Sequence, residues 1–193
     1  MGISGIRLVP HILLLLLTPR RAVIYQDLHR WGTVMRGVQP IGKASYLGLF
    51  VRLMTFNPEY RSLFYYRVGN IGLPLILLCR PMPSLYIYTK KIGGGLFIQH
   101  GFATIIAAAE IGQNCWINQQ VTLGFSNTTD APTLADNVTV SAGAKVIGKV
   151  TVGANSQIGA NAVVVKDVPP NCTVVGVPAY IVKKDGTKVR LSL

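Results

Sequence analysis

The sequence predicts a mainly β protein: a parallel β-helix of six-residue repeats with an N-terminal helical extension. Between residues 85 and 182, aliphatic residues recur at every sixth position, whereas apolar residues before residue 84 recur at spacings of three and four. Half of the 193 residues are hydrophobic and only 13% are charged, so a substantial core can form. We therefore expect a helical, basic extension over residues 1–84, a repeat domain over 85–182 and a C-terminal tail over 183–193.

The extension carries helix start signals. Thr18-Pro19 reads as an N-cap followed by proline at the first helical position, and Asn57-Pro58-Glu59 repeats that signal. After the first signal, one helix face collects Ile24, Leu28, Trp31 and Met35. After the second, the apolar residues at helical spacing are Leu63, Phe64 and Val68. Glycine and proline between residues 69 and 83 break the pattern.

The repeat has a period of six, which fits a short strand, a corner and another short strand. Three such sides make one coil of a triangular prism. We expect the interior positions to be Tyr86, Ile92, Ile98, Ile105, Ile111, Ile117, Leu123, Leu134, Val140, Val146, Val152, Ile158 and Val164. The frame slips by one residue directly after His100. Glycines that follow interior positions are expected to supply the corner dihedral angles; they are Gly112, Gly124, Gly153 and Gly159.

Charge is concentrated in the extension. Of the net +12, residues 1–84 carry +8, with ten Lys/Arg against Asp27 and Glu59, and every arginine except Arg190 lies there. Such a segment suits an anionic partner such as a membrane surface, nucleic acid or a phosphorylated carrier, although a solvated basic face is equally compatible. Nucleic acid is not expected, because no recognition motif or aromatic groove accompanies the charge. Peripheral membrane contact stays open, and so does packing of the apolar helix faces on the prism.

Two short apolar runs, Ile12–Leu17 and Ile71–Cys79, are too short to span a membrane, and neither resembles a signal peptide. The three cysteines, Cys79, Cys115 and Cys172, are widely spaced and form neither a disulfide framework nor a metal pattern. A cytoplasmic location is therefore expected.

Several stretches of the repeat region resemble the left-handed β-helix acyltransferases, and within them the serine acetyltransferase branch. The stretches are Phe97-Ile-Gln-His-Gly101, Val121-Thr-Leu-Gly124, Ala142-Gly-Ala-Lys-Val-Ile-Gly148, the run from Ile158 to Pro170, and Val175-Gly-Val-Pro-Ala179. The resemblance covers residues 85–182, about half of the chain, and it alone implies the left hand of the helix.

The resemblance implies an acetyl-CoA-dependent O-acetyltransferase with His100 as general base. His100 is also the only histidine of the repeat region, and histidine suits proton abstraction because its ordinary pKa lies near neutrality. The acyl-CoA site carried over from the family comprises Gly124, Ala142 and Ala160 for the pantetheine arm, and Lys166 and Lys183 for the adenosine phosphates. Lys184 is a neighbour that would share this role.

Three departures from the serine acetyltransferase pattern bear on the acceptor. Gln99 stands where an aspartate precedes the catalytic histidine, Leu85 where an acid orients it, and Asp130-Ala131 where an Arg-His pair precedes Pro132. Because unpaired ionic groups in a closed site are costly, we expect a neutral acceptor held by amides such as Gln99 and Asn118. A sugar hydroxyl in capsular or surface polysaccharide synthesis is the expectation.

The alternatives are serine O-acetyltransferase in cysteine biosynthesis and a non-catalytic β-helix scaffold. A metal-dependent β-helix hydratase is rejected, since it needs three histidines on adjacent coils while His11 and His29 lie outside the repeat, and no metal is expected. The resemblance also implies a homotrimer with acyl-CoA between subunits. The high apolar fraction supports such outward contacts.

Overall fold

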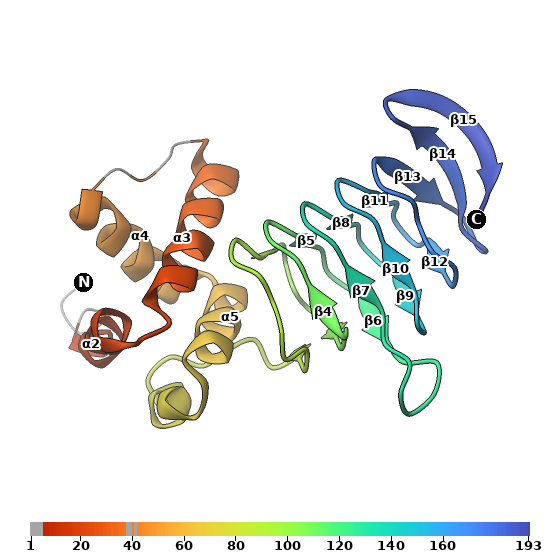
Figure 1. Cartoon of the computed structure of the whole chain (residues 1–193). Coiled ribbons are helices and arrows are strands. Elements are labelled where there is room, and N and C mark those ends of the chain that lie inside the picture. The colour runs from red at the N-terminus through yellow and green to blue at the C-terminus, as the bar shows by residue number, and fades with distance from the viewer. Residues whose placement is uncertain (1–5, 38–39, 41) are drawn as a thin grey trace. The chain divides into compact units, whose positions relative to one another are not determined.

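The computed structural model describes residues 6–37, 40 and 42–193. The chain divides into two compact units, Met1–Pro83 and Ser84–Leu193 (Figure 1). The first is helical and the second contains short strands joined by turns.

The described residues of the helical unit form four α-helices and one 3₁₀ helix. They are α2 (Val9–Leu17), α3 (Arg21–Arg36), α4 (Gly42–Phe56), α5 (Pro58–Val68) and η1 (Gly69–Leu77). The start signal at Asn57 is confirmed, since Asn57 is the N-cap and Pro58 the first residue of α5. The signal at Thr18 was misread. Its N–H donates to the carbonyl of Leu14 and so ends α2, while α3 begins only at Arg21. Among the described residues, no helix is both long enough and apolar enough to cross a membrane.

The apolar stripe of α3 is mostly core. Ile24, Leu28 and Trp31 are at most 1% exposed, whereas Met35 is 46% exposed at the end of the helix. Trp31 meets Tyr60 of α5 edge to face, with ring centroids 5.2 Å apart. Aromatic pairs in this geometry stabilise a fold by more than the area they bury. The stripe that the sequence predicted therefore packs α3 against α5.

A buried ion pair joins the same two helices. Arg67 donates to both carboxylate oxygens of Asp27, from Nε at 2.8 Å and from a terminal nitrogen at 3.1 Å, and both side chains are nearly inaccessible to solvent. Planar guanidinium and carboxylate groups match in this two-bond arrangement. The pair removes one of the two acids of this unit from its surface.

The second unit is a parallel β-helix with three faces. Its strands are β1 (Leu85–Ile87), β2 (Phe97–Ile98), β3 (Thr104–Ile106), β4 (Glu110–Ile111), β5 (Trp116–Ile117), β6 (Thr122–Gly124), β7 (Thr133–Leu134), β8 (Thr139–Val140), β9 (Lys145–Ile147), β10 (Thr151–Val152), β11 (Gln157–Ile158), β12 (Val163–Val164), β13 (Cys172–Val175), β14 (Tyr180–Lys184) and β15 (Thr187–Ser192). They form sheets ordered β1-β3-β6-β9-β12, β4-β7-β10 and β2-β5-β8-β11-β13-β14-β15. Successive coils therefore stack in register, and the six-residue period is confirmed.

Two expected interior residues lie outside. Tyr86 and Ile105 are paired in register but point outward, and the interior column of this sheet is Ile87, Ile106, Leu123, Val146 and Val164. Eight positions separate Ile98 from Ile106, whereas six separate Ile117 from Leu123. The coil after β2 thus holds two extra residues rather than one, and side chains along a strand alternate between faces. A one-residue error in the frame therefore exchanges inside for outside.

The corners depend on asparagine as well as glycine. Asn137, Asn155 and Asn171 adopt positive φ, and their side chains form a ladder in which each amide nitrogen donates to the next oxygen at 3.0–3.1 Å, ending on Asp185. Asparagine tolerates this backbone conformation better than most residues. Three of the expected corner glycines, Gly112, Gly153 and Gly159, are needed because of crowding: a Cβ on Gly153 would lie 2.7 Å from the Cα of Pro170, whereas a Cβ on Gly124 would make only ordinary contacts at 3.4 Å. Close approach of stacked backbones is what requires glycine there.

The C-terminal segment belongs to the third sheet. β14 pairs antiparallel with β13, and β15 pairs antiparallel with β14, so the residues expected as a tail after 182 are paired as far as Ser192. This antiparallel ending covers the last parallel edge, which would otherwise present unpaired backbone groups.

Replacing Asp27 by alanine leaves the Arg67 cation buried without its partner. We expect Asp27→Ala to lower the free energy of unfolding by about 3–5 kcal/mol, measured by urea denaturation with circular dichroism at the helical wavelength. The matched control is Glu110→Ala, which removes an exposed partner 3.7 Å from Lys91 and is worth less than about 1 kcal/mol. Equal losses in the two variants would contradict a stabilising role for the buried pair.

Candidate active site

His100 stands on a protrusion of the β-helix. The stacked corner residues Ala103, Gln120 and Gly143 all have positive φ and follow one another through backbone hydrogen bonds of 2.9–3.0 Å. Four positions separate Gln99 from Ala103, but only two separate its neighbour Asn118 from Gln120. The two extra residues therefore bulge out at this corner.

The bulge has a sharply bent backbone. His100 has φ 63° and Gly101 φ 48°, and the N–H of Phe102 donates to the carbonyl of His100 at 2.6 Å. Positive φ is uncommon for histidine, and strained backbone is frequent at functional sites. The result is an exposed imidazole directly after β2, as the sequence expectation of a local bulge requires.

Neutral amides surround this position. Gln99 lies beside Asn118 on the next coil, because Ile98 pairs with Ile117. The side-chain oxygens of Asn118 and Gln119 are buried and have no hydrogen-bond partner in the described part of the chain. Buried polar atoms are normally paired, so these two acceptors point to a ligand. The oxygen of Gln99 differs: it accepts a bond from the Trp116 indole at 3.2 Å, which leaves its amide nitrogen free to donate.

Nothing acidic orients His100 within the described residues. Leu85, at the position where the resemblance expects an acid, is buried in β1 and pairs with Thr104. The imidazole makes no hydrogen bond to another described residue. Catalytic hydrogen bonds are often formed only when the substrate is bound, so the geometry is compatible with a general base.

Of the residues expected to hold acyl-CoA, Ala142 and Ala160 share the corner of His100. They stack below Gln119, since the N–H of Asn161 donates to the Ala142 carbonyl and that of Gly143 to the Gln119 carbonyl. Because their side chains are single methyl groups, the corner projects little from the surface on the two coils that follow.

The other expected residues lie elsewhere. Gly124 ends β6, at the far end of the strand that begins after Gln120, and pairs with Ile147. Lys166 lies near that same end; it donates to the carbonyl of Leu193 at 2.8 Å and lines a cavity of about 330 Å³. Lys183 is exposed on β14 in a different sheet, opposite Thr173. The structure therefore brings Gly124 and Lys166 to one end of a sheet and separates Lys183 from both.

Sequence reasoning missed Lys145. It lies on β9, and its ammonium donates to the carbonyls of Gln120 and Gly143 at 2.7 and 2.8 Å. These carbonyls belong to the His100 corner, so Lys145 places a fixed positive charge beside it. Only the stacking of coils reveals this, because 45 positions separate the two residues in the chain.

The remaining histidines belong to the helical unit. His11 is buried and hydrogen-bonded to the Tyr65 hydroxyl at 2.8 Å, and burial lowers the pKa of its imidazole. His29 contacts the Tyr46 hydroxyl at 3.2 Å. Among the described residues, no group of three His, Cys, Asp or Glu side chains is arranged to hold a metal ion.

Known proteins share both the repeat and the sequence. A family described as bacterial transferase hexapeptide (six repeats) matches residues 131–166. A serine acetyltransferase of Synechococcus elongatus is 46% identical over 146 residues, covering 68% of this chain and 60% of the relative. A serine acetyltransferase of Staphylococcus xylosus is 47% identical over 103 residues, covering 51% of this chain and 48% of the relative. This chain thus spans 60% and 48% of the length of these two relatives.

The chain has the repeats and the fold of the hexapeptide-repeat acetyltransferases. Solved structures agree with this assignment. Serine acetyltransferase from Brucella abortus superposes with a TM-score of 0.70 at 23% identity, covering 90% of this chain and 73% of that one. Soybean serine acetyltransferase complexed with serine gives 0.69 at 26%, covering 84% and 69%. The left-handed parallel β-helix with N-terminal helices, expected from the sequence, is confirmed as the fold of this chain.

The expected sugar acceptor is wrong. The relatives at 46 and 47% identity are serine acetyltransferases, which favours the alternative over polysaccharide O-acetylation. The expectation rested on the uncharged residues Gln99, Leu85 and Ala131, which stand where the serine acetyltransferase pattern has charged or ionisable ones.

Proposed function

We propose that this hexapeptide-repeat acetyltransferase transfers an acetyl group from acetyl-CoA to the hydroxyl of L-serine, with His100 as general base. One observation carries the proposal: a two-residue bulge presents His100 beside two buried amide oxygens that lack partners, in a chain 46% identical to a serine acetyltransferase.

The reaction needs one proton acceptor and one set of oxyanion donors. Neutral His100 takes the proton of the serine hydroxyl as its oxygen attacks the thioester carbonyl carbon. The resulting oxyanion is stabilised by N–H groups of the bulge, since those of His100 and Gly101 donate no hydrogen bond to another described residue. When the intermediate collapses, the C–S bond breaks and the imidazolium returns its proton to the departing thiolate of CoA.

The serine substrate is held by groups of three coils. Its ammonium donates to the oxygens of Asn118 and Gln119, which need donors. Its carboxylate accepts from the Gln99 amide nitrogen and lies toward the Lys145 ammonium. A charge-assisted pair fixed by backbone carbonyls is pre-organised, so little is lost in positioning the hydroxyl against His100.

Acetyl-CoA binds along the corner formed by Ala142 and Ala160. Gly124, at the opposite end of its sheet, also contacts the pantetheine arm. Lys166 binds the adenosine phosphates, because a phosphate group prefers an ammonium or guanidinium partner. Lys183 lies in a different sheet, so it takes no part in this site.

A homotrimer is part of this proposal. The outer face of the sheet that contains β1 and β3 exposes Tyr86 and Ile105, and Phe102 and Phe125 are exposed at its ends. Exposed aromatic and aliphatic side chains on one face mark a protein interface. Such a face suits packing of identical prisms with the acyl donor between them.

We also propose a cytoplasmic location with peripheral contact at the inner face of the membrane. The support is the +8 charge of residues 1–84, because the cytoplasmic leaflet is negatively charged.

Removing the base should abolish most transfer. We expect His100→Ala to lower kcat by about 10²–10⁴-fold, measured as CoA release with L-serine, while the calorimetric Kd for acetyl-CoA stays unchanged. His29→Ala is the control, since that histidine lies in the helical unit. A His100→Ala enzyme that keeps more than about a third of wild-type activity would exclude His100 as the base.

Lys145 should determine affinity for serine. We expect Lys145→Met to raise the KM for L-serine by about tenfold or more, the value of one lost charge-assisted hydrogen bond, with kcat nearly unchanged. Lys149→Met removes an exposed charge beyond the opposite end of β9, away from the His100 corner, and should leave the KM for L-serine unchanged. If wild-type enzyme shows no turnover with L-serine, the proposed acceptor is excluded.

The alanine corner should accommodate the acyl donor. We expect Ala160→Trp to raise the KM for acetyl-CoA by at least about tenfold, because the indole would fill the path of the pantetheine arm. Ala154→Trp is the matched control, since Ala154 lies at another corner of the same prism, directly before Asn155. Equal effects at both positions would argue against a donor path along the Ala160 corner.

A further inference from the structure

The charged side chains on the surface of the helical unit are almost all positive. Residues 1–83 contain only two acids: Asp27 is buried against Arg67, and Glu59 is half-buried in the first turn of α5. Six cationic side chains, by contrast, are exposed: Arg7, Arg20, Arg21, Lys43, Arg52 and Arg80. An anion approaching this unit meets positive charge with little carboxylate to oppose it.

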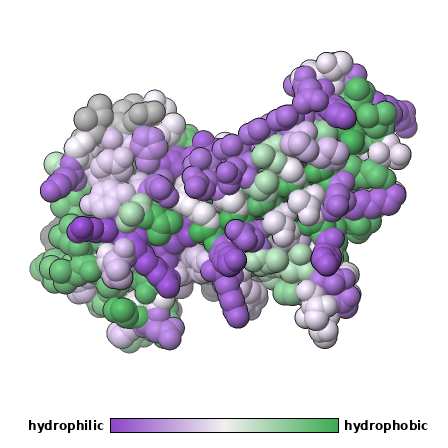
Figure 2. All heavy atoms as spheres, in the orientation of Figure 1, coloured by the Kyte–Doolittle hydropathy of each residue, from purple (hydrophilic) through white to green (hydrophobic). Residues whose placement is uncertain are grey.

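Apolar side chains are exposed on the same unit. They belong to two helices that pack together, α2 and η1. The exposed residues are Val9, Leu13, Leu16 and Leu17 of α2, and Ile71, Leu73 and Leu77 of η1, with Leu17 and Leu77 about four-fifths exposed at 79% and 83%. Figure 2 shows hydrophobic side chains gathered over these two helices. Contiguous exposed apolar surface of this kind marks an interaction site.

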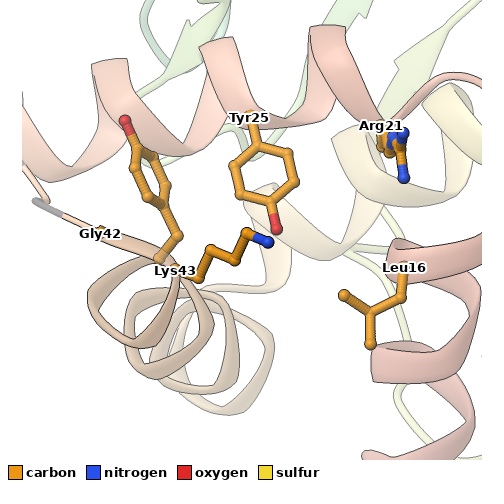
Figure 3. A pocket seen from close by; sticks show the side chains of 6 residues that line it. Leu16, Arg21, Tyr25, Gly42 and Lys43 are labelled. Atoms are coloured by element: carbon orange, nitrogen blue, oxygen red, sulfur yellow. The ribbon is translucent and has the colours of Figure 1, made fainter.

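A cavity of about 500 Å³ opens beside this apolar surface. It is lined by Leu16, Arg21, Tyr25, Gly42, Lys43 and Tyr46. Figure 3 shows the Lys43 ammonium and the Tyr25 hydroxyl turned toward each other, with Arg21 and Leu16 on the other side of the opening. The rings of Tyr25 and Tyr46 meet edge to face at 5.2 Å, which fixes one wall.

The lining suits a phosphate. Arg21 and Lys43 are both exposed and form no ion pair with another described side chain, and no carboxylate lines the cavity. A guanidinium supplies two parallel N–H donors and an ammonium supplies a point charge, while a tyrosine hydroxyl adds a further donor. Phosphate oxygens accept all of these bonds.

We propose that this cavity binds the phosphate headgroup of an anionic phospholipid while the exposed face of α2 enters the boundary of its acyl chains. Leu16 carries this argument, because it lines the cavity and also belongs to the exposed apolar face of α2. A ligand with a phosphate in the cavity would therefore have its hydrocarbon part directed over Leu13 and Leu17. The proposal rests on the peripheral membrane contact proposed above and is independent of the acetyl transfer reaction.

Charge decides against a second copy of the chain as the occupant. Two copies meeting through this face would bring two cationic surfaces together, and no exposed acid of the described residues 6–37, 40 and 42–83 would compensate. Like charges placed opposite one another are repulsive. An anionic bilayer offers the complementary charge together with an apolar phase for α2.

The test is flotation of the full-length protein with phosphatidylcholine vesicles that contain about 30% phosphatidylglycerol, at about 50 mM salt where screening is weak. We expect the wild type to float with these vesicles and not with pure phosphatidylcholine. Arg21→Gln/Lys43→Gln should reduce the floating fraction about tenfold, and Leu13→Gln/Leu17→Gln should reduce it similarly. The matched control Lys149→Gln/Lys188→Gln removes the same charge from the β-helix unit and should float like the wild type. Circular dichroism and acetyl transfer are measured on every variant.

Each outcome decides the proposal. No flotation of the wild type overturns both the membrane contact and the headgroup site, and intact acetyl transfer in the same sample leaves the enzymatic proposal standing. Flotation that Arg21→Gln/Lys43→Gln does not reduce, or that the control reduces equally, overturns the headgroup site alone. Calorimetric binding of inorganic phosphate without flotation would make the cavity a site for free phosphate. Light scattering in which Leu13→Gln/Leu17→Gln dissociates an oligomer would assign the face to a second copy.

Discussion

The stacking of backbones in register is the constraint on which the enzymatic unit depends. Each coil hydrogen-bonds to the next at 2.8–3.0 Å through residues such as Trp116, Thr139 and Ile158 of consecutive strands. At the corners the backbones of stacked coils lie so close together that there is no room for some side chains. A Cβ on Gly153, for example, would collide with Pro170 of the next coil. Interior aliphatics then stack in columns, and every coil repeats the path of its neighbour.

The same rigidity explains the site. β2 is held in register by β5 and β3 by both β1 and β6, so the two extra residues between β2 and β3 leave the prism at the corner, where His100 becomes exposed in a strained conformation. The neighbouring coils keep their path and present Asn118, Gln119 and Lys145 alongside. Backbone stacking thus positions the side chains of the proposed site, which come from residues far apart in the chain, and scaffolds of this rigidity favour pre-organised sites.

The helical unit follows different rules. Aromatic packing of Trp31 on Tyr60 and the ion pair of Asp27 with Arg67 hold its helices together. That ion pair also withdraws an acid from the surface, so cations dominate outside. The buried Asp27 carboxylate therefore links packing in the core to charge on the surface. Arg21 and Lys43 both line the cavity because they lie at the starts of α3 and α4.

The sequence by itself determined the six-residue architecture, the helices after Asn57 and the bulge at His100, because periodicity and glycine placement are local properties of the chain. It misplaced Tyr86 and Ile105, since the number of extra residues in a coil shows only when neighbouring coils align. Only the tertiary structure brought Lys145 to the corner of His100 and left the amide oxygens of Asn118 and Gln119 without partners. Those facts depend on contacts between coils, and residues at such separations leave no pattern in a single sequence.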